Sequence, residues 1–329
     1  MSSMRELAVM AVAGALVAEV GFFTSQFAMA QDYPSKKPIR LIVPFAPGGG
    51  TDIVARLVSQ RVSESLGTTI VVDNRSGAGG STAIDMVLRA APDGYTLIFG
   101  AASYATNAAL YKLSYDPVND ITPIHLTCLS GYLLSLHPSV PAMTTVELIA
   151  YAKQRPGGLS YGSSGIGGLA HLATELFTSM SGTKMTHVPY KGTGPALTDV
   201  LGGQIQVLMG SIPSTTQHVK MNRLRGISVT TSKRSALVPD IPTIAETLPG
   251  YEAVLWYGVW GPKNLPANVV NRWNKDLDAL IQLADMRERM SKEGVEPAGG
   301  SPQQFKTVLA RDIAKWTKVA REAKVVIDQ

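Results

Sequence analysis

The chain has 329 residues, of which 45% are hydrophobic and 17% are charged, a composition typical of a folded protein large enough for two domains. The net charge of +5 is spread out with no run of Lys or Arg, which excludes an obvious nucleic-acid surface and mildly favours anionic ligands. Cys128 is the only cysteine, which excludes an intramolecular disulfide and a cysteine-based metal cluster.

The first thirty residues have the pattern of a secretory signal peptide. Residues 7–18 are almost wholly apolar, and residues 27–30, "FAMA", place small residues at the −3 and −1 positions of a cleavage site. We predict cleavage after Ala30 and a periplasmic protein. An uncleaved anchor is the alternative, because Glu19 interrupts the apolar run. No other apolar run approaches about 20 residues, the length that spans a bilayer.

From Ile39 onward, short β-branched runs alternate with segments of helical period. In chain order the segments are "IRLIVPF", "TDIVARLVSQRVSESL", "TTIVVDN", "GGSTAIDMVLRAA" and "YTLIFG". This alternation predicts βαβ units around a mostly parallel sheet.

A second series with the same alternation begins after Pro141. It opens with "TTVELIAYAKQR", a predicted helix capped by Thr144 or Thr145. A third part, from "YEAVLWYGVWGP" to the end, predicts an aromatic strand followed by two long helices at about 266–292 and 302–325.

Two loops in successive series share the same order of parts. Residues 43–52 read "VPFAPGGGTD" and residues 188–199 read "VPYKGTGPALTD", each with a strand, a glycine loop, Thr-Asp and a helix. The echo predicts two similar lobes that face each other across a cleft.

Glycine loops of this kind occur four times, at residues 47–52, 74–82, 161–168 and 190–199, and each follows a strand and opens a helix. The first N–H groups of a helix have no intrahelical partner and lie at the positive end of its dipole, so they can hold an anion. Several converging helix starts could therefore bind a carboxylate without any arginine.

Nucleotide and catalytic interpretations find little support in the sequence. No phosphate-loop string G-x-x-x-x-G-K-[ST] occurs, and residues 165–170 lack the acidic residue that a dinucleotide fingerprint needs about 20 positions later. The histidines lack metal-ligand spacing, so we expect no metal and no cofactor. A periplasmic hydrolase that uses Ser163 or Ser164 with His171 remains the alternative from another class.

Ordered motifs extend from Tyr33 to the C-terminus, namely "YPSKKPIRLIVPFAPGGGTDIVAR", "VVDNRSGAGG", "AAPDGYTL", "ALYKLSYDPVNDITPI", "LSYGSSGIGGLAHLA", "VPYKGTGPALTDVLGGQI", "RLRGISVTTSKRSALVPDIPTIAE" and "GYEAVLWYGVWGP". Together they closely resemble the Bug-type periplasmic solute-binding receptors of tripartite tricarboxylate transporters, the TctC-like family.

This resemblance implies an α/β fold: a two-lobed periplasmic-binding-protein clamshell in which each lobe is a mixed, mostly parallel sheet flanked by helices. Lobe 1 would comprise residues 32–130 and 250–329, and lobe 2 residues 131–249. The implied protein is a monomeric, non-enzymatic receptor for a di-, tri- or aromatic carboxylate, and it binds no nucleic acid. Its implied partners are membrane transporter subunits or, alternatively, a sensor kinase ectodomain.

The resemblance also implies a set of ligand-binding residues, carried over position by position. The first lobe would contribute Phe45, Gly48, Gly49, Gly50, Thr51, Asp52 and Ser103, and the second lobe Ser163, Ser164, Gly165, His171, Tyr190, Lys191, Gly192 and Thr193.

Several of these residues have a purely structural alternative. Thr51 or Asp52 could instead cap a helix, and His171 could pack on a helix face. Phe45 and Tyr190 could be core residues, and Lys191 could be a solvated lysine. Trp256, Tyr257 and Trp260 are interpreted as core residues beside the hinge.

The chain departs from the family pattern at several positions. Ser76 and Ser81 replace the usual Pro and Asn, Tyr104 replaces a common His, and Gln206 and Gly210 replace two aspartates. If either missing aspartate faced the ligand, its loss would argue against an amino-acid ammonium group and for a wholly anionic or aromatic carboxylate.

Overall fold

The computed structural model describes residues 33–322 and residue 325. The predicted signal peptide, residues 1–30, lies outside the described residues. From Lys36 onward the chain forms one compact unit, whose structure is described below. Among the described residues, no helix combines the length and the apolar character needed to cross a membrane.

The first sheet has the strand order β11-β4-β10-β3-β1-β2. Its strands are β1 (Ile39–Val43), β2 (Ile70–Asn74), β3 (Thr96–Ala101), β4 (Ile121–Ser130), β10 (Leu255–Pro262) and β11 (Glu296–Pro297). β1 pairs in parallel with β2 and β3, whereas β10 runs antiparallel to β3 and β4. β1 is buried except at Arg40, as expected for a strand that is covered on both faces.

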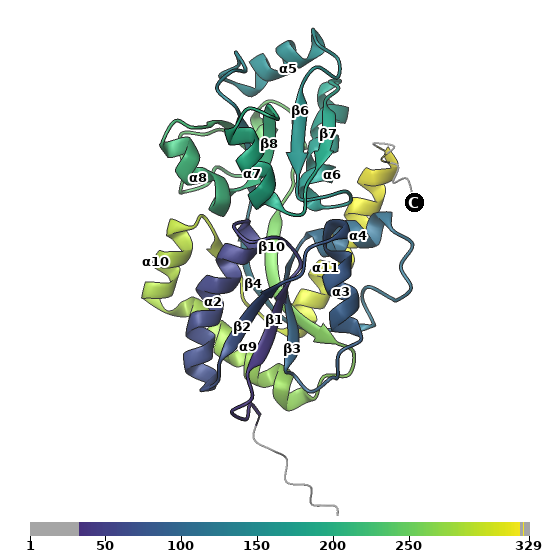
Figure 1. Ribbon diagram of the computed structural model, residues 1–329, viewed down its shortest axis with the longest axis vertical. Coiled ribbons are helices and arrows are strands. Elements are labelled where there is room, and N and C mark those ends of the chain that lie inside the picture. Colours follow the sequence, from purple (N-terminus) through teal and green to yellow (C-terminus); the bar gives the residue numbers. More distant parts are fainter. Residues whose placement is uncertain (1–32, 323–324, 326–329) are drawn as a thin grey trace, which may run out of the picture. The chain divides into compact units, whose positions relative to one another are not determined.

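Helices cover both faces of this sheet (Figure 1). They are α2 (Gly50–Leu66), α3 (Ser81–Leu88), α4 (Ser103–Leu110), α9 (Ala267–Gln282), α10 (Ala284–Lys292) and α11 (Pro302–Glu322), with a short 3₁₀ turn η2 (Ala78–Gly80) before α3. α2 contacts α9, and α4 contacts α11.

The prediction of one helix over residues 266–292 is wrong, because the chain breaks between α9 and α10. Leu283 has extended backbone angles (φ −63°, ψ 134°) and is half exposed. The buried positions explain the break: α9 buries Leu277 and Ile281, and the next buried residue is Met286 on α10. A step of five residues does not keep one face of a straight helix on the core, since neighbours on a face lie three or four apart.

The second sheet has the order β7-β6-β8-β5-β9. Its strands are β5 (Tyr132–Leu136), β6 (Ser160–Ser163), β7 (Thr186–Pro189), β8 (Val207–Ser211) and β9 (Arg225–Val229). Around it lie α5 (Thr145–Lys153), α6 (Leu169–Ser181), α7 (Thr193–Leu201), α8 (Ile212–Lys220) and the 3₁₀ turn η3 (Ile244–Glu246). Of the two predicted caps for α5, Thr144 is the N-cap, and its hydroxyl accepts a hydrogen bond from the N–H of Glu147.

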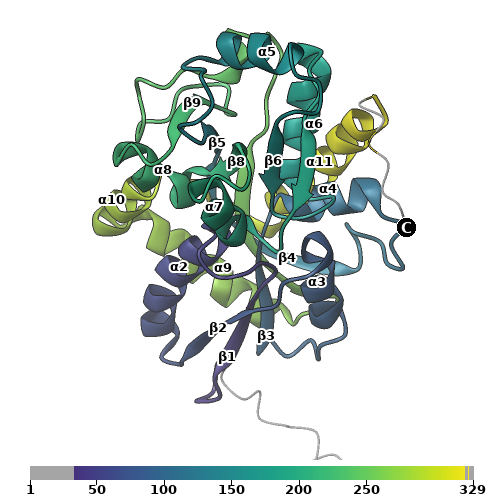
Figure 2. The same cartoon turned by 45° about the horizontal axis from the view of Figure 1, so that its top comes forward.

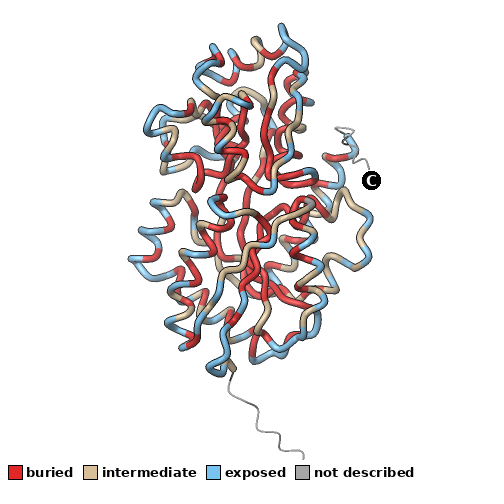
Figure 3. The backbone as a smooth tube through the Cα atoms, in the orientation of Figure 1, coloured by how far each residue is buried: buried red, intermediate tan, exposed pale blue. Residues whose placement is uncertain are grey.

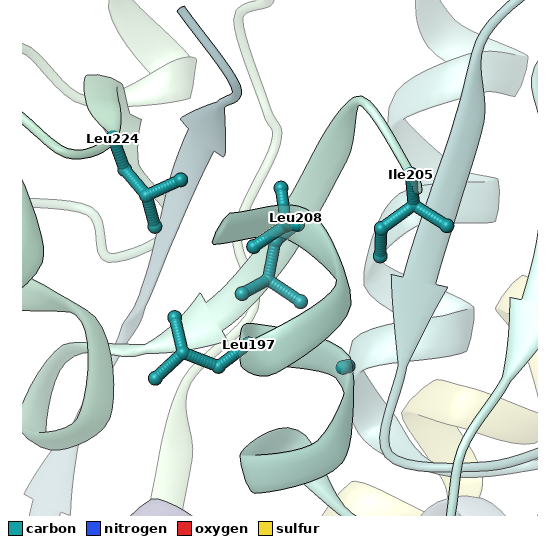
Figure 4. Packing of buried hydrophobic residues seen from close by; sticks show 6 residues of the cluster. Leu197, Ile205, Leu208 and Leu224 are labelled. Atoms are coloured by element: carbon teal, nitrogen blue, oxygen red, sulfur yellow. The ribbon is translucent and has the colours of Figure 1, made fainter. Parts of the chain in front are cut away.

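A hydrophobic cluster fixes α7 against β8 in this second lobe. Leu197 on α7 and Leu208 on β8 pack with Ile205 and Leu224 (Figure 4). Because α7 is anchored in this way, its first turn is held in a fixed position at the edge of the lobe.

The two sheets are joined by chain segments that cross from one lobe to the other (Figure 2). β4 continues through Gly131 into β5, and the chain returns from β9 to β10 through residues 230–254. These crossings are tied together, since the Thr230 N–H donates to the carbonyl of Tyr132 and the Ala253 N–H donates to the carbonyl of Thr230. Buried residues continue along the strands of both lobes (Figure 3).

The predicted two-lobed α/β fold is confirmed, and each sheet is mixed. β10 and β11 run against the other strands of the first sheet, and β5 runs against those of the second. The places where the chain changes sheets support the proposed division into lobe 1 (32–130 and 250–329) and lobe 2 (131–249).

Candidate functional site

The two echoing glycine loops lie against each other, as their sequences predict. The N–H of Ala46 in the first loop donates a hydrogen bond of 2.9 Å to the carbonyl oxygen of Lys191 in the second. The approach is close, because a Cβ atom added to Gly194 would overlap the carbonyl oxygen of Pro47. The loops therefore close one side of the space between the lobes.

A small pocket lies behind these loops. Its lining residues are Phe45, Gly49, Gly50, Thr51, Ala101, Ser103, Tyr132, Ser164, Thr193, Ser211, Leu255 and Tyr257. The lining contains hydroxyl groups and aromatic rings but no acidic, basic or histidine side chain. We call this space the cleft pocket.

Four helices begin at the cleft pocket. α2 begins at Gly50, α4 at Ser103 and α7 at Thr193, while Ser211 is the N-cap of α8. In none of the four does the N-cap side chain accept a hydrogen bond from a backbone N–H of its own helix. Two of these helices belong to each lobe, so the pocket is complete only when the lobes are together.

This arrangement produces a positive electrostatic environment without a cation. The unpaired N–H groups and the dipole of each helix favour a negative charge, by about 0.3–1 kcal/mol per exposed terminus and up to about 2 kcal/mol when partly buried. The lining residues are buried, and electrostatic interactions are stronger in such surroundings than in water. The cleft pocket is therefore suited to a small anion such as a carboxylate.

About half of the residues predicted from the sequence line the cleft pocket. They are Phe45, Gly49, Gly50, Thr51, Ser103, Ser164 and Thr193. Phe45 is buried, but it is not only a core residue. It lines the cleft pocket and also a neighbouring pocket.

Three other predicted residues line a larger and more open neighbouring pocket, which shares Phe45 and Ser164 with the cleft pocket. These residues are Gly165, Tyr190 and Lys191. The Tyr190 hydroxyl donates to Asp199 at 2.7 Å, and the side chain of Lys191 is exposed. Gly48 lies on the outer rim of the loops.

Asp52 and Gly192 hold the loops in place and do not line the cleft pocket. The carboxylate of Asp52 accepts hydrogen bonds from Gly48 N–H, Arg56 and the Asn74 amide. Burial alone would raise the pKa of Asp52, but the hydrogen bonds from these partners lower it below the ordinary value. Gly192 has φ of +144°, and a Cβ atom there would lie 3.1 Å from the backbone nitrogen of Ala46.

Ser163 and His171 lie in a cluster behind the loop before α6. Ser163 Oγ lies 2.6 Å from His187 Nε2, and the rings of His187 and His171 stack 4.1 Å apart. His171 Nδ1 accepts a hydrogen bond from the N–H of Gly167. These contacts position the loop, so the structural alternative for His171 fits its surroundings. Among the described residues, no group of three or more His, Cys, Asp or Glu is placed to hold a metal ion.

We expect the histidine cluster to make stability depend on pH. Burial lowers the pKa of His171 to about 4, and burial together with the nearby His171 lowers that of His187 to about 3. In the unfolded chain both would titrate near about 6.5. Between pH 6.5 and 4 the unfolded state therefore binds more protons, and the free energy of unfolding should fall as pH is lowered below about 6.5.

Denaturant unfolding at pH 7 and pH 5 measures this effect. The variant His187→Gln should show a smaller loss of stability between these two pH values than the unmodified protein. An unchanged difference would mean that other groups cause the pH dependence.

Sequence reasoning missed five residues of the cleft-pocket lining: Ala101, Tyr132, Ser211, Leu255 and Tyr257. Three of them lie on β5 and β10, the strands that follow the two crossings between the lobes. Their position beside a crossing between the lobes could have indicated that they lie near the cleft. The alternation of residues along a strand, however, does not show which side of the strand faces the cleft pocket.

The interpretation of the aromatic strand as core fits Trp256 and Trp260. The Trp256 indole donates to the carboxylate of Asp312 at 2.8 Å, and Trp260 packs on Tyr104 with ring centroids 5.1 Å apart. Tyr257 lies between them and points to the other side of the strand, into the cleft pocket.

The residues that depart from the family pattern do not line the cleft pocket. Gln206 is used at the far end of β8, where its side-chain oxygen accepts from the N–H of Ser160. A Cβ atom at Gly210 would point at Thr215. Neither missing aspartate would face the cleft pocket, so the condition for the ammonium argument is not met.

A larger pocket lies on the opposite side of the segments that cross between the lobes. Gly131, Ile212 and Val254 line it, whereas their chain neighbours Tyr132 and Ser211 line the cleft pocket. Only one helix begins at this larger pocket, and no buried side-chain group without a partner faces it among the described residues. The smaller cleft pocket is therefore the candidate ligand site.

Comparison with known proteins gives consistent matches along the chain. A family model described as tripartite tricarboxylate transporter family receptor (TctC) matches residues 54–325. Protein BugT of Bordetella pertussis is 33% identical over 317 residues, covering 95% of this chain and 96% of BugT.

Two solved structures from Rhodopseudomonas palustris are similar over nearly their whole length. Rpa4515 with adipate has a TM-score of 0.87 and 38% identity, covering 90% of this chain and 99% of that chain. MatC with bound malate has a TM-score of 0.82 and 30% identity, covering 86% and 98%.

Proposed function

We propose that this chain, which belongs to the tripartite tricarboxylate transporter receptor (TctC) family, is an extracytoplasmic receptor. In this proposal it binds a small dicarboxylate in the cleft pocket. Receptors of this family are periplasmic solute-binding proteins and not enzymes. Family membership therefore argues against the hydrolase alternative.

The observation that carries this proposal is the convergence of four uncapped helix starts on an uncharged pocket. A carboxylate placed there gains hydrogen bonds and charge complementarity from both lobes at once. A ligand with an ammonium group would find no acidic side chain in the lining. The acids bound in the two related structures, adipate and malate, support a dicarboxylate as the ligand class.

The partner we propose is the membrane part of a tripartite tricarboxylate transporter, to which the closed receptor would deliver its ligand. The matching family model supports this choice over a sensor kinase. We also propose that export removes residues 1–30, so the mature protein would begin at Gln31. N-terminal sequencing of the exported protein tests the cleavage site, and co-purification with the transporter subunits tests the partner.

A thermal-shift screen tests the ligand class. We expect a dicarboxylate, from a panel of succinate, malate, adipate, citrate and benzoate, to raise the unfolding temperature most, because a ligand that binds only the native state stabilises it. The stabilisation is about 2.7 kcal/mol at a hundredfold excess over Kd. For a chain of this size that corresponds to a shift of roughly 5 °C.

The matched controls in this screen are succinamide and adipamide, which have the shape of the acids without the charge, together with neutral sugars. We expect no shift with these compounds. A screen in which only sugars or cations stabilise the protein would overturn the proposed function.

A further inference from the structure

Two hydroxyl groups in the cleft pocket have no hydrogen-bond partner in the described part of the chain. They are the hydroxyl of Tyr257 on β10 and Oγ of Ser164 in the loop before α6. Tyr257 is fully buried and Ser164 is 6% exposed. Since nearly all buried polar groups in folded proteins are hydrogen-bonded, a buried hydroxyl without a partner requires a specific explanation.

Other buried tyrosines of this chain show the ordinary arrangement. The hydroxyl of Tyr104 donates to the carbonyl oxygen of Pro117 at 2.7 Å, and that of Tyr251 donates to the carbonyl oxygen of Ala173 at 2.9 Å. The ring of Tyr257 stacks on Phe99 with centroids 6.3 Å apart, a contact that phenylalanine would make equally well. Packing therefore does not explain why a hydroxyl is present at position 257.

The position of the Tyr257 hydroxyl indicates what it could contact. A Cβ atom added to Gly50 would lie 2.5 Å from this hydroxyl and 2.5 Å from Ser211 Oγ. The hydroxyl thus lies directly beside the first residue of α2, where the helix dipole favours an anion. Ser211 is already hydrogen-bonded to Ser214 at 2.7 Å and makes no hydrogen bond of normal geometry with Tyr257.

The protonation state of Tyr257 suits a donor. Burial raises its pKa well above the ordinary value, although the neighbouring Ser211 hydroxyl acts in the opposite direction. The phenol is therefore neutral at any physiological pH and can donate a hydrogen bond to an anion. Ser164 approaches the same pocket from the opposite lobe.

We propose that Tyr257 is a ligand-binding residue whose hydroxyl donates a hydrogen bond to the carboxylate held at the start of α2, with Ser164 as a second donor from the other lobe. This inference rests on the proposed function and adds side-chain donors to it. It also makes β10, the strand that follows the return crossing into lobe 1, part of the ligand site.

The experiment compares Tyr257→Phe with Tyr251→Phe, a matched removal of a buried hydroxyl outside the pocket. For each variant, calorimetry measures the affinity for whichever acid of the panel above binds the unmodified protein most tightly. Thermal unfolding without ligand measures intrinsic stability. The two readouts separate a ligand contact from a structural role.

We expect Tyr257→Phe to weaken binding by roughly 10- to 100-fold, the usual effect of losing a hydrogen bond to a charged group. Its ligand-free unfolding temperature should be unchanged or higher, because an unpartnered hydroxyl is removed. Tyr251→Phe should show the reverse pattern, with lowered stability and unchanged affinity. Ser164→Ala should resemble Tyr257→Phe.

Binding of the acid to Tyr257→Phe within twofold of the unmodified protein would overturn this inference, as would a loss of ligand-free stability without a loss of affinity. If Tyr257→Phe does not fold, unchanged affinity in Ser164→Ala would overturn it. Failure of the proposed function is a different result, in which no acid of the panel binds the unmodified protein.

Discussion

Replacing Gly194 by alanine is expected to weaken ligand binding by roughly 5- to 150-fold. A Cβ atom at this position would overlap the carbonyl oxygen of Pro47 in the opposing lobe, and a backbone oxygen cannot rotate away. Overpacking of this kind typically costs about 1–3 kcal/mol, and every 1.4 kcal/mol is tenfold in affinity. The cost applies only when the lobes close, so each lobe should fold normally. Calorimetric titration measures the affinity.

Gly49→Ala is the matched control for this prediction. It also adds one methyl group at the contact between the loops, but its Cβ would lie 3.6 Å from Thr193, an ordinary packing distance. Gly49 has extended backbone angles (φ −84°, ψ 163°), which alanine adopts without strain. If both variants bound the ligand as well as the unmodified protein, closure of the two loops would not be needed for binding.

The second large effect is expected from Thr51→Asp, which places a negative charge in the lining of the cleft pocket. Two like charges about 4 Å apart repel by about 4 kcal/mol at the effective dielectric constant of a protein surface. Binding of a carboxylate should therefore weaken by about a thousandfold. An acidic residue in the first turn of α2 complements the helix dipole, so the fold should not suffer.

Thr51→Asn is the control, since asparagine has the shape of aspartate without its charge. We expect Thr51→Asn to bind the ligand far more tightly than Thr51→Asp, with similar unfolding temperatures for both in the absence of ligand. Equal affinities in the two variants would contradict the electrostatic account. The loss of affinity would then come from the changed shape of the side chain and not from its charge.

Much of the fold was predictable because hydrophobic period and glycine position are local signals. Runs such as β1 and β3 alternate with amphipathic segments such as α2, and this pattern alone indicates βα units. The break at Leu283 was not predicted, because both flanking segments have good helical composition. Only the five-residue step from Ile281 to Met286 shows that one straight helix could not bury both.

The candidate site was predictable where it consists of helix starts. Gly50, Thr51 and Thr193 line the cleft pocket, as the glycine loops indicate. The role of Asp52 was harder to predict, because a carboxylate at a helix start can contact a ligand or stabilise its own loop. Here it accepts hydrogen bonds from Gly48 and Arg56 and stabilises the loop. That choice depends on side-chain direction, which the sequence does not show.

Most of the lining residues that the sequence did not predict lie on the strands that follow the crossings between the lobes. Trp256 and Tyr257 are adjacent and equally aromatic, yet one packs in the core and the other reaches the pocket. Neighbouring residues on a strand face opposite sides, so a pattern of apolar residues cannot decide which side is the cleft. The pairing of β10 with β3 and β4 settles the direction, and that pairing is non-local.

The central claim is that helix starts from both lobes hold a carboxylate in a pocket without charged side chains. Calorimetric titration of the protein with the tightest-binding dicarboxylate and with the corresponding diamide tests it most directly. The two ligands have nearly the same shape and differ in charge. The account predicts that the acid binds at least about 100-fold more tightly than the diamide, as the loss of charge-assisted hydrogen bonds requires. Equal binding of the two, or tighter binding of the diamide, would contradict it.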